Sequence, residues 1–165
     1  MAEILDIVDE NNKIIGKTTK DQILKENLIH RGVVIFLFNK KDELFVHQRT
    51  NNMIIYPGMW SMTLGGSVVS GENFLKAAER ETREEVGISN PKPEFLFFDR
   101  YQSPLDNVIA AVYKLIYEGK ITAQKEEIVK GFFVSLKKLE KMMEEKSFCP
   151  DAIQYFNKLK KTMSK

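Results

Sequence analysis

The sequence predicts an α/β or α+β fold in which a mixed β-sheet lies between helices. Three observations support this prediction. Gly32–Asn39 is a nearly continuous apolar run, rich in β-branched residues, as expected of a buried strand. Asn73–Val86 has the strongest helical pattern of the chain, and Gly87 provides its C-terminal stop. Further strands and helices follow one another without strict alternation, which favours a mixed sheet.

Turn-forming residues divide the first fifty residues into elements. Residues 3–18 are predicted to form a hairpin, because two runs rich in Ile and Val flank the polar cluster Asp9–Asn12. A short helix is expected over Lys20–Asn27. The buried run Gly32–Asn39 is then followed by the alternating strand Glu43–Arg49. We expect these two strands to form a second hairpin.

The remaining elements are predicted in the same way. Thr50–Gly58 contains Asn, Pro and Gly and is expected to be a loop. Large apolar residues alternate along Met59–Val69, which predicts a strand that ends in a Gly-Gly pair. The later predictions are strands at Glu94–Arg100, Val108–Tyr117 and Gly131–Leu136, and helices at Lys137–Glu145 and from Pro150 to about residue 162.

Length and charge narrow the class of protein. The 165 residues are expected to form a single domain, 1–165, with residues 1–30 as an N-terminal extension. With 25 basic and 23 acidic residues, the charge of +2 gives no reason to expect a nucleic-acid or membrane partner. The single cysteine, Cys149, excludes an internal disulfide and fits a reducing compartment. No segment resembles a signal peptide or a membrane span. We expect a cytoplasmic protein that is a monomer or a homodimer.

Three glutamates on the strongest predicted helix are candidates for chemistry. Offsets of three and four residues place Glu81, Glu84 and Glu85 on one helix face. Like charges at these spacings cost a helix roughly 0.2–0.5 kcal/mol per pair, so a basic partner or a divalent cation should offset them. A solvated acidic face is the alternative, and the interleaved Arg80 and Arg83 are compatible with it.

The segment before this helix favours the cation. Residues Gly65–Glu72, GGSVVSGE, begin with a Gly-Gly pair, which allows the backbone to approach a ligand closely and free carbonyl groups to face a cation. Carboxylate and carbonyl oxygens are the ligands that Mg²⁺ prefers. Such a site recruits diphosphates. A metal ion then neutralises the phosphates and lowers the pKa of a bound water, and a carboxylate takes the proton.

The spacing of these residues resembles the Nudix box, GX5EX7REUXEEXGU, in which U is a bulky aliphatic residue. The chain carries Gly66, then Glu72 after five residues, then Arg80–Ile88 after seven more. Every fixed position matches. Thr82 departs from the pattern at the first U position, which faces the core, so only local packing is affected.

The resemblance implies an α/β/α sandwich that cleaves nucleoside diphosphates linked to another moiety, with Mg²⁺, or Mn²⁺ in its place, as cofactor. By position, Glu81, Glu84 and Glu85 would be metal ligands, and Glu84 or a later glutamate would act near the attacking water. The Gly65 carbonyl would add a ligand. The residues with structural roles in the motif would be Gly66, Glu72, Arg80 and Gly87, with Arg80 orienting the glutamates and Glu72 bracing the loop.

Several residues outside the box are further candidates for the site. The family often adds one acidic residue from a later loop, and Glu126 and Glu127 are the candidates here, although a solvated turn explains them equally well. Arg49 is either a phosphate contact or a surface residue. The aromatic residues that could stack on a base are Trp60, Tyr56 and Tyr101, although alternation with apolar neighbours favours the core for Trp60.

Outside the box, the chain is similar to the branch related to isopentenyl diphosphate isomerase, over roughly residues 3–157. An isomerase is therefore a rival hypothesis. Its catalytic Cys and metal-binding His are replaced here by Gly65 and Ser67, which favours hydrolysis. His30 alone survives and is interpreted as structural. A catalytically silent nucleotide-binding module is a third hypothesis, but the intact box is evidence against it.

Overall fold

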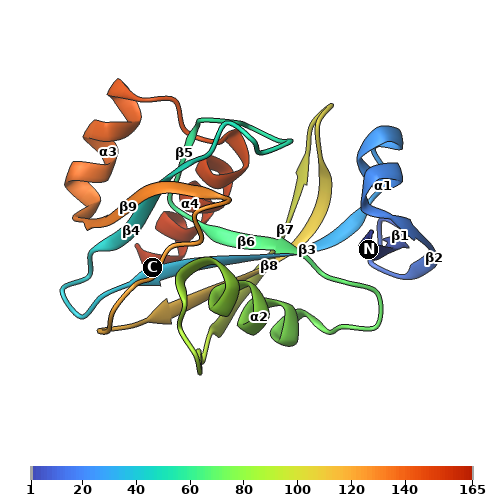
Figure 1. Cartoon of the computed structure of the whole chain (residues 1–165), viewed down its shortest axis with the longest axis horizontal. Helices are drawn as coiled ribbons and strands as arrows, with labels where there is room; N and C mark the ends of the chain where they lie inside the picture. The colour runs from blue at the N-terminus through green and yellow to red at the C-terminus, as the bar shows by residue number, and fades with distance from the viewer. Residues whose placement is uncertain (1, 165) are drawn as a thin grey trace.

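The computed structural model describes residues 2–164. The elements follow in the order β1 (Ile4–Val8), β2 (Ile14–Thr19), α1 (Lys20–Glu26), β3 (His30–Phe38), β4 (Leu44–Arg49), β5 (Trp60–Ser61), β6 (Leu64–Ser67), α2 (Phe74–Val86), β7 (Glu94–Gln102), β8 (Asn107–Ile116), β9 (Ile128–Val134), α3 (Leu136–Glu145) and α4 (Pro150–Met163). The predicted α/β/α arrangement is confirmed, because a mixed sheet separates α2 from α3 and α4 (Figure 1).

Within the described residues, seven strands form the central sheet. The order of its main path is β5-β4-β3-β8-β7, with β6 paired to β3 and β9 paired to β4. The pairing of β3 with β8 is parallel, whereas the other pairings are antiparallel. The sheet is therefore mixed, as predicted.

The central strand β3 explains why the sheet needs cover on both sides. Its side chains point alternately to the two faces, as strand geometry requires. Those at positions 33, 35 and 37 join Ala77, Ala78 and Val86 of α2 in one core, whereas those at 34, 36 and 38 join Phe156 of α4 in the other. Both sets are almost fully buried, so an apolar run on β3 satisfies two cores at once.

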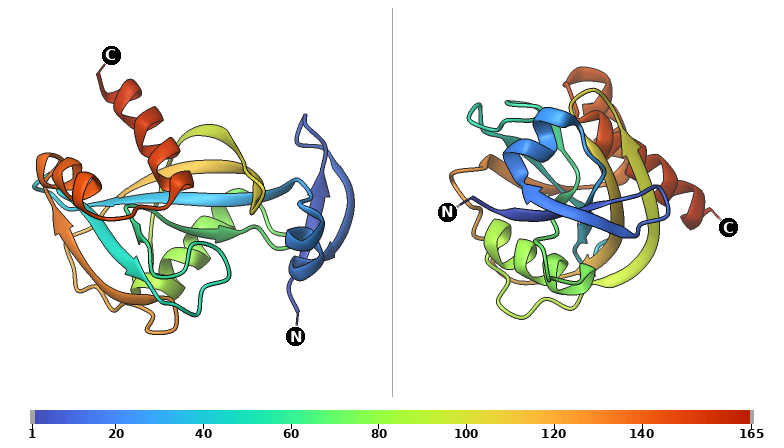
Figure 2. Two further views of the ribbon diagram at one scale, coloured as in Figure 1. Left: turned by 90° about the horizontal axis from the view of Figure 1, so that it is seen from above. Right: turned by 90° about the vertical axis from the view of Figure 1, so that its right-hand side faces the viewer.

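The N-terminal hairpin and α1 lie together at one end of the sheet (Figure 2). The predicted hairpin and helix are confirmed, with β1 and β2 forming a separate two-stranded sheet. The Thr19 hydroxyl caps α1 by accepting a hydrogen bond from the Gln22 amide. A bridge between Leu5 and Val69 connects the hairpin to the segment that precedes α2.

The predicted hairpin of β3 and β4 is wrong beyond its turn. The two strands pair only at Phe38 and Leu44. Beyond that point β6 occupies the edge of β3, while β4 pairs along its length with β9. The two strands separate because each finds a different partner. The space between them is where the cavity described below lies.

Two other predicted strands had wrong boundaries. The strand expected over Met59–Val69 is divided into β5, which pairs with β4, and β6, which pairs with β3. The Ser61 hydroxyl accepts the Thr63 amide at this break and stabilises a local bend. The strand expected over Gly131–Leu136 is β9, which begins at Ile128 and ends before Ser135, the N-cap of α3.

Helix α2 has the caps that its sequence predicts. The Asn73 side chain accepts the Lys76 amide at the N-terminus, and Gly87 adopts the left-handed conformation at the C-terminus with φ of 72°. Thr82 is fully buried, and its hydroxyl donates to the Ala78 carbonyl at 2.7 Å. Thr82 departs from the motif, but its buried hydroxyl has a hydrogen-bond partner. None of the helices between residues 2 and 164 is long and apolar enough to span a membrane.

Candidate active site

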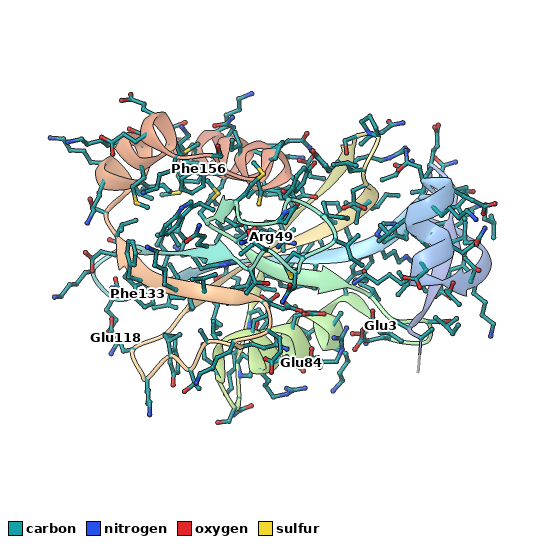
Figure 3. All side chains as sticks on the ribbon, turned by 45° about the horizontal axis from the view of Figure 1, so that its top comes forward. Glu3, Arg49, Glu84, Glu118, Phe133 and Phe156 are labelled. Carbon is teal, nitrogen blue, oxygen red and sulfur yellow. The ribbon has the colours of Figure 1, made fainter. Side chains whose placement is uncertain are left out.

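A cavity of about 250 Å³ lies between the separated halves of the sheet. Strands β3, β4 and β6 form its floor and walls, and α2 closes one end. Figure 3 shows Arg49 near the middle of the molecule, between α4 on one side and α2 with Glu84 on the other. The predicted site residues that line the cavity are Arg49, Gly65, Gly66, Glu81, Glu84, Glu85 and Glu127.

The Gly-Gly pair fits closely between β3 and α2. A Cβ atom on Gly65, whose φ is 153°, would lie 2.0 Å from the Val33 carbonyl oxygen. A Cβ atom on Gly66 would lie 2.3 Å from Oε1 of Glu81. The Gly65 amide also donates to Oε2 of Glu85 at 3.1 Å. Only glycine permits this approach, which brings the loop backbone against two carboxylates of the helix.

Arg80 holds the glycine loop to α2. Its Nε and Nη2 donate to the two carboxylate oxygens of Glu72 at 2.8 and 2.9 Å, and Nη2 also donates to the Ser67 carbonyl at 3.0 Å. Its Nη1 donates to Glu81 at 2.8 Å and to Glu84 at 3.3 Å. The bond to Glu72 raises the pKa of Arg80. Burial alone would raise the pKa of Glu72, but the bonds from Arg80 and the Val69 amide outweigh it and lower that pKa.

Of the three motif glutamates, Glu85 is buried, Glu81 is largely buried with 12% of its side chain exposed, and Glu84 faces solvent. Burial raises the pKa of Glu81 to about 7, against the lowering effect of Arg80 and with a further rise from the charges of Glu84 and Glu127. Burial also raises the pKa of Glu85, and the charges of Glu81 and Glu127 add to the effect. The Glu84 side chain is 52% exposed and pairs with Arg80. A solvated acidic face therefore does not describe Glu81 and Glu85.

Glu127 joins these carboxylates from the loop before β9. It lines the cavity and its charge raises the pKa of Glu85, whereas its neighbour Glu126 is exposed and offers its backbone carbonyl to Thr50. The Thr50 amide donates to the Glu127 carbonyl at 2.9 Å, which fixes this loop to the end of β4. Of the two acidic candidates in this loop, the structure therefore brings only Glu127 to the motif helix.

The donor set fits a hard divalent cation. The carboxylates of Glu81, Glu85 and Glu127 lie beside a loop whose two glycines carry no side chains. Of these three described glutamates, only Glu81 forms an ion pair with a cationic residue. Oxygen donors of this kind suit Mg²⁺ and Mn²⁺. Among residues 2–164 no three acidic, imidazole or thiol groups already form a complete ligand cluster. The carboxylates would therefore rotate to share an ion.

Arg49 and His47 line the middle of the cavity from β4. Nη2 of Arg49 donates to the Ile55 carbonyl at 2.8 Å, and its Nε is buried without a hydrogen-bond partner among the described residues. Nε2 of His47 lies 2.9 Å from the Thr63 carbonyl oxygen and donates to it, which leaves Nδ1 as a buried acceptor, also without a described partner. Burial lowers the pKa of His47 to about 4, so its ring is neutral. Sequence reasoning placed Arg49 here but missed His47.

The end of the cavity away from α2 contains several polar groups, of which Asp106 and Asp151 were not indicated by the sequence. His30, at the start of β3, faces the carboxylate of Asp106 at 3.5 Å, and Asp151 lines the same end from α4. Cys149 is buried there, and burial raises the pKa of its thiol to about 12, so it is neutral. Tyr56 lines the cavity and hydrogen-bonds with the buried Tyr101.

The other aromatic candidate, Trp60, lies in the core. It is 6% exposed and packs against Phe132 and Phe148. The apolar alternation around Trp60 predicted a core position rather than stacking on a base, and this prediction is confirmed. Asp106 and Asp151 had no comparable signal, because each is a single acidic residue at the border of an element.

Comparison with known proteins gives the family. The NUDIX domain family matches residues 28–154. An uncharacterized Nudix hydrolase of Streptomyces coelicolor is 35% identical over 160 residues, which cover 96% of this chain and 88% of the relative. An isopentenyl-diphosphate Delta-isomerase of Photorhabdus laumondii is 28% identical over 151 residues, covering 87% and 86%. A crystal structure from Deinococcus radiodurans has a TM-score of 0.81 at 23% identity, covering 94% of this chain and 98% of that one.

These matches agree with the motif and with the arrangement of the sheet. The motif helix, the glycine loop and most of the residues that line the cavity fall within the matched residues 28–154. The similarity to both hydrolases and an isomerase agrees with the branch that the sequence indicated. The chain therefore belongs to the Nudix family, as a Nudix-type pyrophosphohydrolase of the branch that resembles isopentenyl-diphosphate isomerase.

Proposed function

We propose that this enzyme hydrolyses the phosphoanhydride of a nucleoside diphosphate linked to another moiety, with Mg²⁺, or Mn²⁺ in its place, as cofactor. The observation that carries the proposal is the burial of Glu81 and Glu85 beside Glu127 at one end of the cavity. Several buried carboxylates are unfavourable without a cation to offset their charge. A diphosphate needs the same cation, so one ion answers both requirements.

Each residue has a separate task in this proposal. Glu81, Glu85 and the Gly65 carbonyl would hold the ion, with Glu84 at the solvent side. When bound, Mg²⁺ neutralises the diphosphate charge and activates a water. Glu127 or Glu84 accepts the proton of the attacking water. Arg80 keeps Glu81 in position through its bond at 2.8 Å. Arg49, whose Nε has no partner among the described residues, contacts a phosphate oxygen.

The proposed setting follows from the same features. The substrate is a small molecule, because the cavity between the sheet and α2 has a volume of only about 250 Å³ and the net charge of +2 is small. We propose that the protein acts in the cytoplasm, where the thiol of Cys149 stays reduced. It would act as a monomer or homodimer, without a nucleic-acid or membrane partner.

A screen over nucleoside diphosphate derivatives tests the proposal, in which an added phosphatase releases measurable phosphate from the monophosphate products of anhydride cleavage. Isopentenyl diphosphate is included without the phosphatase, and its products are followed by chromatography. Glu85→Gln keeps the shape of the side chain and removes its charge, so turnover should fall about 100-fold or more. Glu84→Gln should also lower turnover. Glu79→Gln, on the same helix but outside the cavity lining, is the matched control and should keep the wild-type rate. Wild-type turnover by Glu84→Gln and Glu85→Gln under saturating Mg²⁺ would contradict the assignment.

The same screen separates the alternatives. Isomerised product without released phosphate would support an isomerase, even though Gly65 and Ser67 stand where the isomerases have their catalytic Cys and metal-binding His. Tight binding of a nucleotide with no turnover of any compound would support a silent binding module. Phosphate release that depends on a divalent ion supports the hydrolase.

A further inference from the structure

The end of the cavity away from α2 presents two partly buried carboxylates. Asp106 lies in the turn between β7 and β8, and Asp151 lies in the first turn of α4. Each has one oxygen, Oδ1, that accepts a neighbouring backbone amide, from Asn107 at 3.0 Å and from Ala152 at 2.8 Å. Among residues 2–164, neither Oδ2 atom accepts a hydrogen bond. Two acceptors are therefore free where the cavity ends.

The two carboxylates influence each other. Burial raises the pKa of both side chains, and the charge of Asp106 raises the pKa of Asp151 further. His30, Lys20 and Arg49 only partly offset these charges, since His30 and Lys20 act on Asp106 and Arg49 acts on Asp151. A bound group that brings N–H donors would satisfy the two Oδ2 acceptors and stabilise this arrangement.

A second and independent observation also points to a ligand. His47 is 4% exposed and lines the same cavity, yet its Nδ1 has no hydrogen-bond partner among the described residues. The Nε of Arg49 next to it is likewise buried without a described partner. Buried polar atoms in native proteins are seldom left unpaired, so each of these calls for a group supplied from outside the chain. The Nδ1 acceptor of His47 suits a ribose hydroxyl, and the Nε donor of Arg49 suits a phosphate oxygen.

The walls at this end are apolar and aromatic. The loop between β4 and β5 contributes Met53, Ile55 and Tyr56 to the lining, and the bond from Arg49 to the Ile55 carbonyl holds that loop in place. Apolar and aromatic side chains beside these acceptors suit a planar ring that carries N–H groups on its edge. A base with a carbonyl oxygen in place of the amino group would instead place an acceptor against a carboxylate.

We propose that Asp106 and Asp151 select the nucleobase, and that the enzyme takes nucleotides whose base carries an exocyclic amino group. This inference rests on the proposed hydrolysis of nucleoside diphosphate derivatives. The amino group of cytosine or adenine donates to the carboxylates, whereas uracil and hypoxanthine have an oxygen at the same position. Asp106 and Asp151 are therefore specificity-determining residues, and their carboxylates face the base rather than the reacting phosphorus.

Matched substrate pairs test the inference. Cytidine and uridine diphosphate derivatives differ at one position of the same ring, as do adenosine and inosine derivatives. The ratio of kcat/KM between the amino and the oxo member of each pair should be about 100 or more. Asp151→Asn replaces an acceptor oxygen by an amide that can donate, and should lower this ratio at least tenfold. Asp106→Asn should act in the same direction.

Controls separate specificity from stability. Asp21→Asn makes the same chemical change on the exposed face of α1 and should keep the wild-type ratio. A ratio of two substrates measured on one preparation does not depend on the fraction of folded enzyme. Equal turnover of both members by the wild-type enzyme, or an unchanged ratio in both aspartate variants, would overturn the inference while hydrolysis itself stands.

Binding gives a readout that does not depend on hydrolysis. Cytidine and uridine monophosphate contain no anhydride, so calorimetry with the full chain measures selection of the base alone. Tighter binding of cytidine monophosphate, by about tenfold or more, supports base selection even when no anhydride in the panel is cleaved. Equal affinities would contradict it. The failure of the proposed reaction and the failure of base selection are thus distinguishable.

Discussion

Gly66 and Glu81 are in such close contact that no side chain fits between them. A Cβ atom on Gly66 would lie 2.3 Å from Oε1 and 2.5 Å from Cδ of Glu81. Nη1 of Arg80 donates to the same Oε1 at 2.8 Å, so the carboxylate is held from a second direction. The glycine thus determines where Glu81 can lie, although it contributes no functional group of its own.

Gly66→Ala should therefore displace Glu81 while the fold persists. A displacement of about 1 Å in a catalytic group can lower the rate about 100-fold, and we expect a loss of that order. Turnover and the concentration of Mg²⁺ needed for half-maximal rate are the measurements, and circular dichroism reports the fold. Gly16→Ala is the control, because its Cβ would meet only Ile7 at 3.6 Å. Wild-type turnover by Gly66→Ala would show that the position of Glu81 is not critical.

Arg80→Lys should lower both stability and turnover. Lysine keeps the charge but cannot donate in parallel to both oxygens of Glu72 and still reach Glu81. Loss of these partly buried bonds should cost about 2 kcal/mol in the free energy of unfolding, measured by urea denaturation. The exposed Arg83→Lys, three residues along the same helix, should change neither quantity. Equal effects of the two substitutions would mean that the fork geometry of Arg80 is unimportant.

Glu127→Gln and Glu126→Gln form a pair of adjacent variants with different expected results. Glu127 lines the cavity, where its charge acts on Glu85 of the motif helix, whereas the side chain of Glu126 is exposed. Glu127→Gln should lower kcat about 100-fold if this carboxylate takes the proton of the attacking water. Glu126→Gln should leave kcat unchanged. A greater effect at Glu126, or none at either residue, would leave Glu84 as the acceptor.

The motif and the helix that carries it were predictable because they depend on local chemistry. The capping residues Asn73 and Gly87, the spacing of the glutamates and the buried run of β3 are all visible in the sequence. Local propensity decides such features within a few residues. The order of the sheet was not visible, since β3 pairs with β8 and β4 pairs with β9, both far along the chain.

The missed site residues share a physical reason. Asp106 and Asp151 stand in a turn and at a helix start, where an acidic residue is common without any function. They share one cavity with Arg49 only because β3 and β4 separate after the Phe38–Leu44 pair. That separation is a tertiary feature, and the hairpin signal in the sequence indicated the opposite. His47 was hidden in the same way within an alternating strand.

His47 should make the folded protein sensitive to mild acid. Its pKa is about 4 in the folded chain, because burial disfavours the charged ring, and 6.5 is its ordinary value. Between these two values the unfolded chain binds a proton that the folded chain does not, so stability falls as pH falls from 6.5 towards 4. The shift corresponds to about 3 kcal/mol, all of it present above pH 6.5.

The measurement compares the wild-type protein with His47→Gln by thermal unfolding from pH 7.5 to 4.5. The glutamine amide can still donate to the Thr63 carbonyl but cannot bind a proton in this range. Other groups titrate alike in both proteins, so the difference between the two Tm curves isolates His47. The wild type should lose roughly 5 °C or more relative to the variant as the pH falls, at 2–4 °C per kcal/mol for a chain of this size. Parallel Tm curves would show that the ring of His47 is protonated as easily in the fold as in the unfolded chain, and that its Nδ1 is not the neutral acceptor inferred for the cavity.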